Sequence, residues 1–434
     1  MSLSVENSKE LNHILTRISI ALLIYVLLQS NFPNSKIPLT LMTIMSMSIF
    51  YNTGIYKFFK SRVFGSISRV DIVSRSEEEL LKSLKSLNSY ESKTRNWNNN
   101  KKKNFRQLST RQQRLVFKTG YLDKIDKVDK CIEKNNELIK DLVKFSMINH
   151  NISLKKFYSS SINIPNENYK VIECLCHYTR DWSNLGDVEI KPIILYIQKI
   201  LEKILTVEQR SKTCVIVPGS GLGRISHEIA IMGGKDNINK NFKMVNSIEF
   251  SSLMFLFNEF VYSNLNNNFK NNYKPKKYQL FPYIHTYSNH LTTENQIRSI
   301  EFNQLSSKPL NLKISNENFN NFILKNDDEY DNIVIVTVFF MDTAENIIDY
   351  LDTMDKIVSP IKGKKIWINI GPLKYGTAPK VELNLQEIQD LRKSYGWECI
   401  DESLKPELLG YLTDLKGMWQ GQYGVSMFAC EMKK

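Results

Sequence analysis

The sequence is poor in cysteine, and its cysteines lack the spacing that would give them a joint role. Six occur in 434 residues: Cys131, Cys174, Cys176, Cys214, Cys399 and Cys430. They form no paired framework, and Cys174-x-Cys176 has no second ligand pair, so neither a disulfide scaffold nor a zinc site is expected. We predict reduced thiols, a reducing compartment and no metal.

The chain also lacks an excess of acid, since 58 Lys and Arg residues face 45 Asp and Glu residues, a net charge of +13. Such a surplus fits nucleic acid, an anionic membrane or a small anionic substrate, so its position matters. Much of it lies before Lys130. The run Lys101–Lys103 falls in an Asn-rich stretch, residues 98–104, that we predict to be a loop. Any polyanion would therefore bind outside the catalytic core, and nucleic acid is not the expected partner.

Two long apolar runs stand near the N-terminus. Ile18–Leu28 is almost wholly apolar, and Ile37–Tyr56 carries no charge. The second run approaches the roughly 20 residues needed to cross a bilayer. Lys57 and Arg62 follow it and favour a cytoplasmic position for the rest of the chain. We predict a membrane hairpin over residues 18–56 with the catalytic domain in the cytosol. The alternative is a helical hairpin packed on a soluble protein of the cytosol or nucleus.

A helical region follows, because apolar residues recur at three- and four-residue steps from Ser76 to Ser146. A second stretch, Tyr169–Leu205, contains Arg180 and ends in an apolar helix predicted from Pro192. Arg180 is expected to pair with Asp181 or another acid. The length suits a catalytic domain of roughly 200 to 250 residues with a helical partner. We predict domains at 1–62, 63–205 and 206–434.

A Gly-rich turn opens the catalytic half. Cys214–Pro218 has the composition of a buried strand, and Gly219, Gly221 and Gly223 separate it from an amphipathic helix. Gly-x-Gly-x-Gly differs from the Gly-x-Gly-x-x-Gly of dinucleotide folds, which holds a pyrophosphate. S-adenosylmethionine has no phosphate, and its turn wraps the amino acid and ribose parts. The sequence therefore predicts this cofactor.

Acidic residues mark the ends of the next two predicted strands. Met244–Phe250 brings Glu249 to where the ribose hydroxyls would lie, and the β-branched run Asp331–Phe340 leads to Asp342. Ligands of open α/β sheets bind outside the carboxyl ends of the strands, so Asp342 should face the substrate. The remaining elements are predicted at Ala344–Val358 (helix), Lys365–Ile370 (strand), Leu385–Tyr395 (helix), Glu398–Ile400 (strand) and Val425–Met432 (strand).

The fold class that follows is α/β, a Rossmann-like class I methyltransferase sheet. We expect it to be mostly parallel with a terminal antiparallel hairpin, and to be preceded by a helical domain.

Several ordered segments resemble the carnosine N-methyltransferase family, whose members transfer a methyl group from S-adenosylmethionine to an imidazole nitrogen of β-alanyl-histidine. The resemblance extends from about Glu77 to the end. Its segments are Arg180–Ser183, Val217–Ile225, Phe281–Asn289, Gln296–Arg298, Phe339–Ala344, Asn346–Tyr350 and Ile368–Leu373.

The resemblance implies which residues hold the two ligands. Those for the cofactor are His177, Arg180, Gly219, Gly221, Gly223, Glu249, Asn318, Phe319 and Val338. Asp342 would bind the imidazole, and Tyr375 and Tyr423 the dipeptide. The chain departs from the family at three positions. His177 replaces a Gln, Asn318 replaces an acid at the adenine amine, and Gly376 stands where the family has a substrate-contacting His.

The predicted function is N-methylation of a histidine imidazole in a small peptide, such as carnosine, which would become anserine. Asp342 would orient the ring and stabilise the imidazolium. His285 and His290 are further candidates for the pocket wall. Two alternatives stay open: a membrane-tethered methyltransferase that acts on protein or RNA, and a non-catalytic scaffold with the same fold.

Overall fold

The computed structural model describes residues 25–26, 28–31, 35, 69–160, 162–164, 168–234, 240–265, 274–376, 378–403 and 405–433. It divides into two units, Met1–Glu77 and Glu78–Lys434. The predicted membrane hairpin, residues 18–56, lies almost entirely outside the described residues. Within the described part of the chain, no helix has both the length and the apolar character that a membrane span requires.

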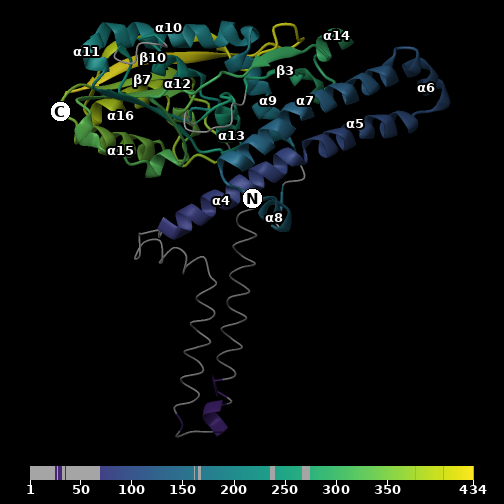
Figure 1. Ribbon diagram of the computed structural model, residues 1–434, viewed down its shortest axis with the longest axis horizontal. Helices are drawn as coiled ribbons and strands as arrows, with labels where there is room; N and C mark the ends of the chain where they lie inside the picture. Colours follow the sequence, from purple (N-terminus) through teal and green to yellow (C-terminus); the bar gives the residue numbers. More distant parts are fainter. Residues whose placement is uncertain are drawn as a thin grey trace. The chain divides into compact units, whose positions relative to one another are not determined.

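One mixed sheet forms the centre of the second unit (Figure 1). Its strands run in the order β5-β2-β1-β6-β7-β10-β8, and β9 pairs with β10. Neighbours from β5 to β7 are parallel, whereas β10 is antiparallel to both β7 and β8. The bounds are β1 Thr213–Pro218, β2 Met244–Glu249, β5 Leu312–Asn316, β6 Asn332–Val338, β7 Lys365–Gly371, β8 Trp397–Glu402, β9 Glu407–Gly410 and β10 Gln422–Met432. The predicted fold class is confirmed.

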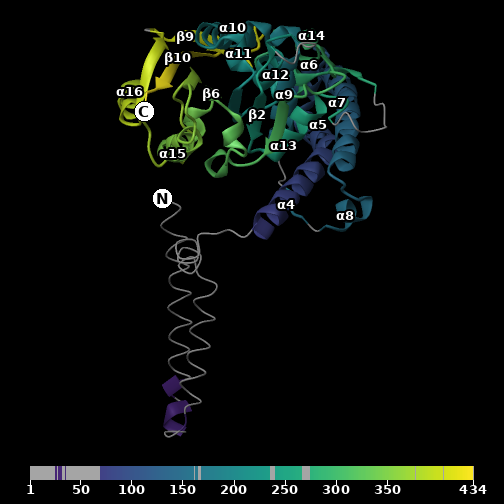
Figure 2. The same ribbon diagram turned by 60° about the vertical axis from the view of Figure 1, so that its left-hand side comes forward.

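Helices cover both faces of this sheet, because its strands are apolar on both sides. Val215 and Val217 pack on one face, and Cys214 and Ile216 on the other. Burial of each such branched side chain contributes roughly 1.5–3 kcal/mol. The first face is covered by α10 (Asp187–Ile204), α12 (Arg224–Ala230) and α13 (Ser252–Phe260), and the second by α15 (Ile347–Val358) and α16 (Leu385–Ser394) (Figure 2).

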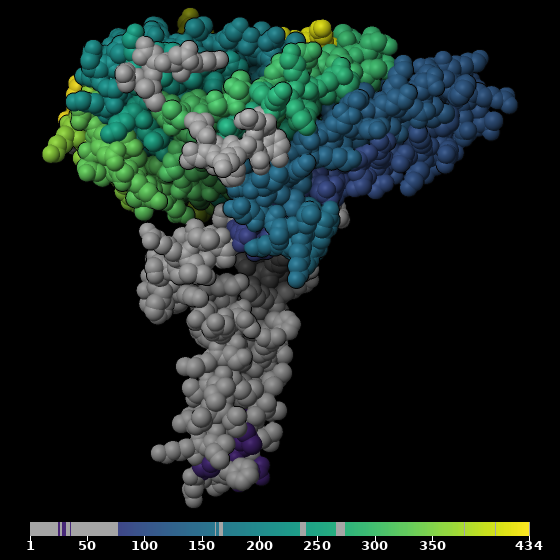
Figure 3. All heavy atoms as spheres, viewed as in Figure 1, coloured from purple at the N-terminus to yellow at the C-terminus, as the bar shows by residue number. Residues whose placement is uncertain are grey.

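The helical part precedes the sheet in the chain and packs beside it. A long antiparallel pair, α5 and α7, projects beyond the sheet with α6 at its tip (Figure 3). The helices are α4 Arg69–Asn88, α5 Tyr90–Arg106, α6 Thr110–Phe117, α7 Tyr121–Asn149, α8 Leu154–Ser159, α9 Tyr169–Trp182 and α11 Val207–Arg210. The short elements are η1 Asn184–Gly186, β3 Lys277–Leu280, η3 Pro282–His285, α14 Thr293–Gln296, β4 Ile300–Asn303, η4 Phe319–Asn321, η5 Asp327–Glu329 and η6 Met341–Thr343.

The prediction of a loop at residues 98–104 was wrong, since these residues lie inside α5. Asn98 is fully buried there and donates to the carbonyl oxygen of Ile125 at 2.9 Å and to a carboxylate oxygen of Asp129 at 2.8 Å. Lys102 pairs with Asp126 at 2.6 Å. Contacts with α7 therefore hold a sequence of low apolar content in a helix.

The apolar helix predicted from Pro192 begins five residues earlier, at Asp187. Ile190 is buried on the same face as Ile193 and Ile197, so the apolar stripe starts before the proline. The helix forms around Pro192 because this stripe is buried against the sheet.

Candidate active site

The Gly-rich turn connects β1 to α12 at the carboxyl edge of the sheet. Gly219 and Gly221 have φ angles of +60° and +54°, which glycine adopts without strain. A Cβ on Gly219 would lie 2.4 Å from the ring of Phe340, and one on Gly223 would lie 2.3 Å from Asn258. A Cβ on Gly221 would meet nothing within 4 Å. Gly219 and Gly223 are required because the turn packs closely against Phe340 and Asn258. Gly221 instead leaves open space where a ligand can approach.

Glu249 ends the neighbouring strand, β2, and binds the same turn. Its carboxylate accepts from the backbone N–H of Gly221 at 2.8 Å and of Ser251 at 2.7 Å. The side chain is buried, and burial raises the pKa of the carboxyl. Each oxygen keeps one lone pair for a further donor. The carboxylate can therefore accept from the two hydroxyls of a ribose placed against the turn.

The end of α9 rests on the Gly-rich turn. The indole N–H of Trp182 donates to the carbonyl oxygen of Leu222 at 2.9 Å, and Arg224 donates to the carbonyl oxygen of Asp181 at 2.8 Å. Arg180 pairs with Asp181 at 3.0 Å, as the sequence predicted. The helical part is thereby attached to the loop that would hold the cofactor.

Arg180 keeps one nitrogen donor without a partner. Its side chain is 8% exposed, its Nε forms an ion pair with Glu189 at 3.7 Å, and Nη2 has neither a hydrogen-bond nor an ion-pair partner in the described part of the chain. The guanidinium lies 4.7 Å from the ring centre of Tyr411 and 5.5 Å from that of Phe339. A buried guanidinium with a free Nη2 donor can bind a carboxylate. Together with the space at Gly221 and the acceptors of Glu249, it fits the amino acid and ribose parts of S-adenosylmethionine.

Asp342 lies in η6, directly beyond the tip of β6. Its side chain is 7% exposed, and Oδ2 accepts from the backbone N–H of Lys374 at 2.9 Å. Burial raises the pKa of this carboxyl. The backbone contact fixes the carboxylate beside the segment that follows β7. Asp342 therefore lies at the carboxyl edge of the sheet, where the sequence analysis expected it.

Three aromatic rings gather next to Arg180. Phe339 lies 4.8 Å from Tyr411 and 6.1 Å from Tyr423, and the two tyrosines are 6.5 Å apart. Phe339 has a φ of +50°, a strained value for a bulky residue. Lys374 donates to the hydroxyl of Tyr423 at 3.2 Å. We call Phe339, Tyr411 and Tyr423 the aromatic cluster.

Sequence reasoning assigned no site role to Phe339 or Tyr411. Phe339 stands in a segment shared with the family, which was the available signal. The position of Tyr411 depends on contacts far along the chain, because Glu189 of α10 accepts from the N–H groups of Leu412 and Thr413 at 2.9 and 2.8 Å.

Of the residues predicted at the adenine and elsewhere around the cofactor, Phe319 lies near Phe340. Phe319 is buried, and its ring centre lies 5.6 Å from that of Phe340, the ring that touches Gly219. Asn318 caps η4, and its amide oxygen accepts from the N–H of Asn320 at 3.0 Å. Val338 is the last residue of β6 and is partly buried.

Three other residues predicted for the site, His177, Tyr375 and His285, contact other residues of the protein. His177 is buried with its ring 5.7 Å from Tyr411, and burial, with the nearby Arg180, lowers its pKa to about 3. Tyr375 uses its hydroxyl to donate to the carbonyl oxygen of Leu383 at 2.9 Å. His285 accepts from Tyr90 at 2.9 Å and donates to Pro282, so its role is structural.

Comparisons with known proteins agree with this geometry. The family model described as Carnosine N-methyltransferase matches residues 159–434. Carnosine N-methyltransferase of Rattus norvegicus is 31% identical over 321 residues, which cover 69% of this chain and 72% of that protein. The Schizosaccharomyces pombe protein of the same name is 27% identical over 77% of this chain and 90% of its own length. An uncharacterized protein of Saccharomyces cerevisiae is 27% identical over 84% of this chain and 83% of its own length.

Proposed function

The chain belongs to the carnosine N-methyltransferase family and is an S-adenosylmethionine-dependent methyltransferase, and we propose that its acceptor is the histidine imidazole of a small peptide such as carnosine. The observation that carries this proposal is the buried carboxylate of Asp342, which accepts from the N–H of Lys374, the residue whose ammonium donates to Tyr423 of the aromatic cluster. Carnosine methylated in this way becomes anserine.

The cofactor, when bound, supplies a methyl group on a positively charged sulfur. Arg180 would bind its carboxylate, Glu249 its ribose hydroxyls, and Gly221 would leave room for both. These contacts fix the direction of the methyl group. Much of the rate then comes from positioning, since transfer requires the attacking nitrogen to lie in line with the breaking bond.

Asp342 orients the acceptor ring and stabilises the charge that forms. A neutral imidazole attacks through one nitrogen, while the N–H of the other nitrogen donates to the carboxylate. As the new N–C bond forms, the ring becomes an imidazolium, and the buried carboxylate lies close enough to stabilise it. A raised pKa also makes Asp342 a better acceptor for the proton that the ring then releases.

The aromatic cluster and Lys374 supply the rest of the acceptor pocket. The rings of Phe339, Tyr411 and Tyr423 offer flat faces to an imidazole, and they favour it further once it is a cation. Lys374 holds an ammonium at the hydroxyl of Tyr423, where it can bind the carboxylate of a peptide. This cation lies two residues before Gly376, which replaces the family's substrate-contacting His.

The test is release of S-adenosylhomocysteine by the purified protein with carnosine, free histidine, longer histidine peptides and RNA supplied separately. We expect turnover with a histidine dipeptide, and a loss of about 100-fold or more in kcat for Asp342→Asn. Cofactor affinity should stay within about threefold, because Asp342 is not among the residues that hold the cofactor. Asp390→Asn is the matched control, since Asp390 is an exposed residue of α16.

Two results would contradict the proposal. Turnover with RNA or a folded protein alone would favour the larger acceptor considered from the sequence. Cofactor binding without turnover on any acceptor would favour a scaffold.

A further inference from the structure

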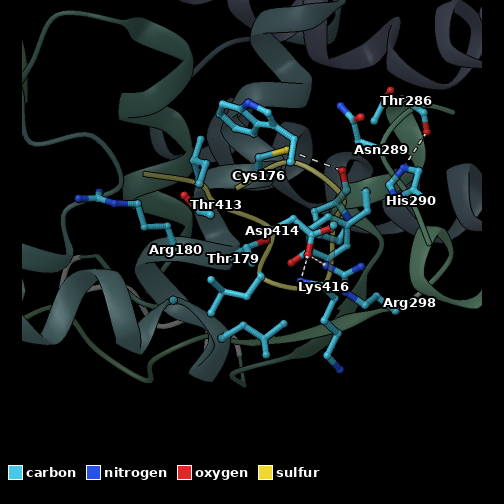
Figure 4. Close-up of a pocket in the computed structure, with 18 of the residues that line it drawn as sticks. Cys176, Thr179, Arg180, Thr286, Asn289, His290, Arg298, Thr413, Asp414 and Lys416 are labelled. Atoms are coloured by element: carbon cyan, nitrogen blue, oxygen red, sulfur yellow. Dashed lines mark hydrogen bonds and ion pairs between the residues drawn. The ribbon is translucent and has the colours of Figure 1, made fainter. Parts of the chain in front are cut away.

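A cavity of about 470 Å³ lies beside the loop that follows Tyr411 and is lined in part by Leu412 and Thr413. Figure 4 shows most of its lining residues, which come from α9, η1, α10, η3, the loops at 286–290 and 412–419, and Arg298 after α14. Arg180, predicted to bind the cofactor, and His290, predicted as a candidate for the pocket wall, are among them, and the side chain of Arg180 extends away from the others. Neither the Gly-rich turn nor Asp342 lines this cavity.

The cavity walls are held firmly by contacts between distant segments. Arg298 stacks 3.5 Å from the ring centre of Tyr283 and forms an ion pair with Asp414. The N–H of Met418 donates to the carbonyl oxygen of Asn289 at 2.9 Å. Arg298 and the segment around Tyr283 belong to family-like segments to which the methyl transfer reaction assigns no role. A preformed cavity of this volume is in the range of small-ligand sites.

Besides Arg180, three lining residues keep a buried polar atom without a hydrogen-bond partner in the described part of the chain: Thr179 Oγ1, His290 Nδ1 and Arg298 Nε. Nε2 of His290 donates to the carbonyl oxygen of Thr286 at 3.1 Å, so Nδ1 of the neutral ring is an acceptor. Arg298 Nε is a donor, and the hydroxyl of Thr179 can be either. An unpaired buried polar atom is unfavourable. A ligand with both a donor and an acceptor would satisfy these atoms.

The rest of the lining combines exposed apolar side chains with equal numbers of positive and negative side chains. Leu185, Leu415 and Trp419 line the cavity and are 49%, 55% and 64% exposed. Exposed apolar side chains around a cavity mark a binding surface. The charged lining residues are three cations and three acids: Arg180, Arg298, Lys416, Glu173, Glu189 and Asp414. This balance favours an uncharged ligand.

We propose that this cavity binds an uncharged peptide segment, with one large apolar side chain inside and its peptide groups bonded to Thr179, His290 and Arg298. A peptide unit carries one donor and one acceptor beside an apolar side chain, the combination that the lining lacks. The bound segment would contact Leu412 and Thr413, whose neighbour Tyr411 belongs to the aromatic cluster. The proposal does not depend on which acceptor is methylated.

The test is a calorimetric titration of the full chain with N-acetyl-phenylalanine amide, beside free phenylalanine, which has the same side chain but two charges. We expect saturable binding of the amide and at least tenfold weaker binding of the free amino acid. Ser288→Trp, which fills the cavity, should weaken binding at least tenfold. Thr179→Val, which removes one hydroxyl, should weaken it about three- to tenfold.

The matched controls make the same two substitutions, Ser to Trp and Thr to Val, at positions outside the cavity. Ser394→Trp adds the ring to an exposed position of α16, and Thr353→Val removes a buried hydroxyl of α15. Both should leave binding unchanged, and S-adenosylmethionine affinity should verify that every variant is folded. No binding below about 1 mM, equal binding of free phenylalanine, or unchanged binding by Ser288→Trp would overturn the proposal.

Discussion

At the scale of single residues, the site contains two kinds of position. At some, the local chemistry allows only one or two residue types, and at others the placement of the side chain depends on the whole fold. A tight turn against Phe340 requires glycine at Gly219, and an acid at a strand tip is the usual acceptor for ribose hydroxyls. Such residues can be predicted from sequence. The strained backbone of Phe339 and the approach of Tyr411 cannot, because neither leaves a local pattern.

The turn glycines give the first prediction. Gly219→Ala should lower both stability and cofactor affinity, because its methyl group would collide with Phe340. Gly221→Ala should weaken cofactor binding at least tenfold, because its methyl group would enter the space left for the ligand. Gly120→Ala is the control for backbone strain, as Gly120 also has a positive φ, +74°, and no neighbour within 4 Å. Thermal unfolding and equilibrium binding separate the effects. Equal cofactor affinity of the Gly120 and Gly221 variants would contradict this assignment.

His177 gives a pH-dependent prediction. Its folded pKa is about 3, well below the unfolded value of about 6.5, so below the unfolded pKa only the unfolded state takes up a proton readily. The folded protein therefore loses stability as the pH falls from about 6.5 toward 3. Between pH 7 and pH 5 this residue should account for a loss of about 2 kcal/mol.

Urea unfolding of the wild type and His177→Gln at both pH values measures that contribution. His285, whose pKa burial lowers to about 4, is present in both proteins and cancels in the comparison. The variant should lose about 2 kcal/mol less than the wild type. Equal losses would show that His177 is not buried in its neutral form.

At the scale of elements, the sequence predicted the central strands well and the Asn-rich helix wrongly. Residues 332–338 and 365–371 are rich in Ile and Val, so both strands could be placed from their composition. Residues 98–104 contain almost no apolar side chain, and polar contacts with α7 stabilise the helix instead. Short edge strands such as Glu407–Gly410 were not predicted, because their partner β10 sets their position.

The helix α5 gives the next prediction. Asn98→Ala should lower the free energy of unfolding by about 1–3 kcal/mol, because it leaves the Ile125 carbonyl, the Asp129 carboxylate and the Tyr287 hydroxyl without their buried partner. Asn99→Ala is the matched control, since Asn99 is exposed on the same helix and should have little effect. Chemical denaturation compares them, and equal values would mean that Asn98 does not anchor α5.

At the scale of the whole molecule, the helical part and the sheet make one site. The sheet supplies the Gly-rich turn, Glu249 and Asp342, while α9 supplies Arg180. The loop that carries Tyr411 is held by Glu189 of α10. Without the helical part, the sheet would lack Arg180 and the contacts from Glu189 that hold the loop of Tyr411. The family match, residues 159–434, includes both α9 and α10.

The N-terminal apolar runs give the last prediction, which rests on sequence alone because residues 18–56 lie almost entirely outside the described part of the chain. If they form the predicted hairpin, the full chain should stay with membranes after alkaline carbonate extraction, whereas a chain of residues 69–434 should be released. Two charges within one run, Leu23→Lys and Leu27→Lys, should release the full chain as well, since each costs about 2.5–3.5 kcal/mol at the centre of a span. Leu3→Lys and Leu11→Lys make the same change outside the runs and should not. Release of the unaltered chain would instead favour the helical hairpin packed on a soluble protein.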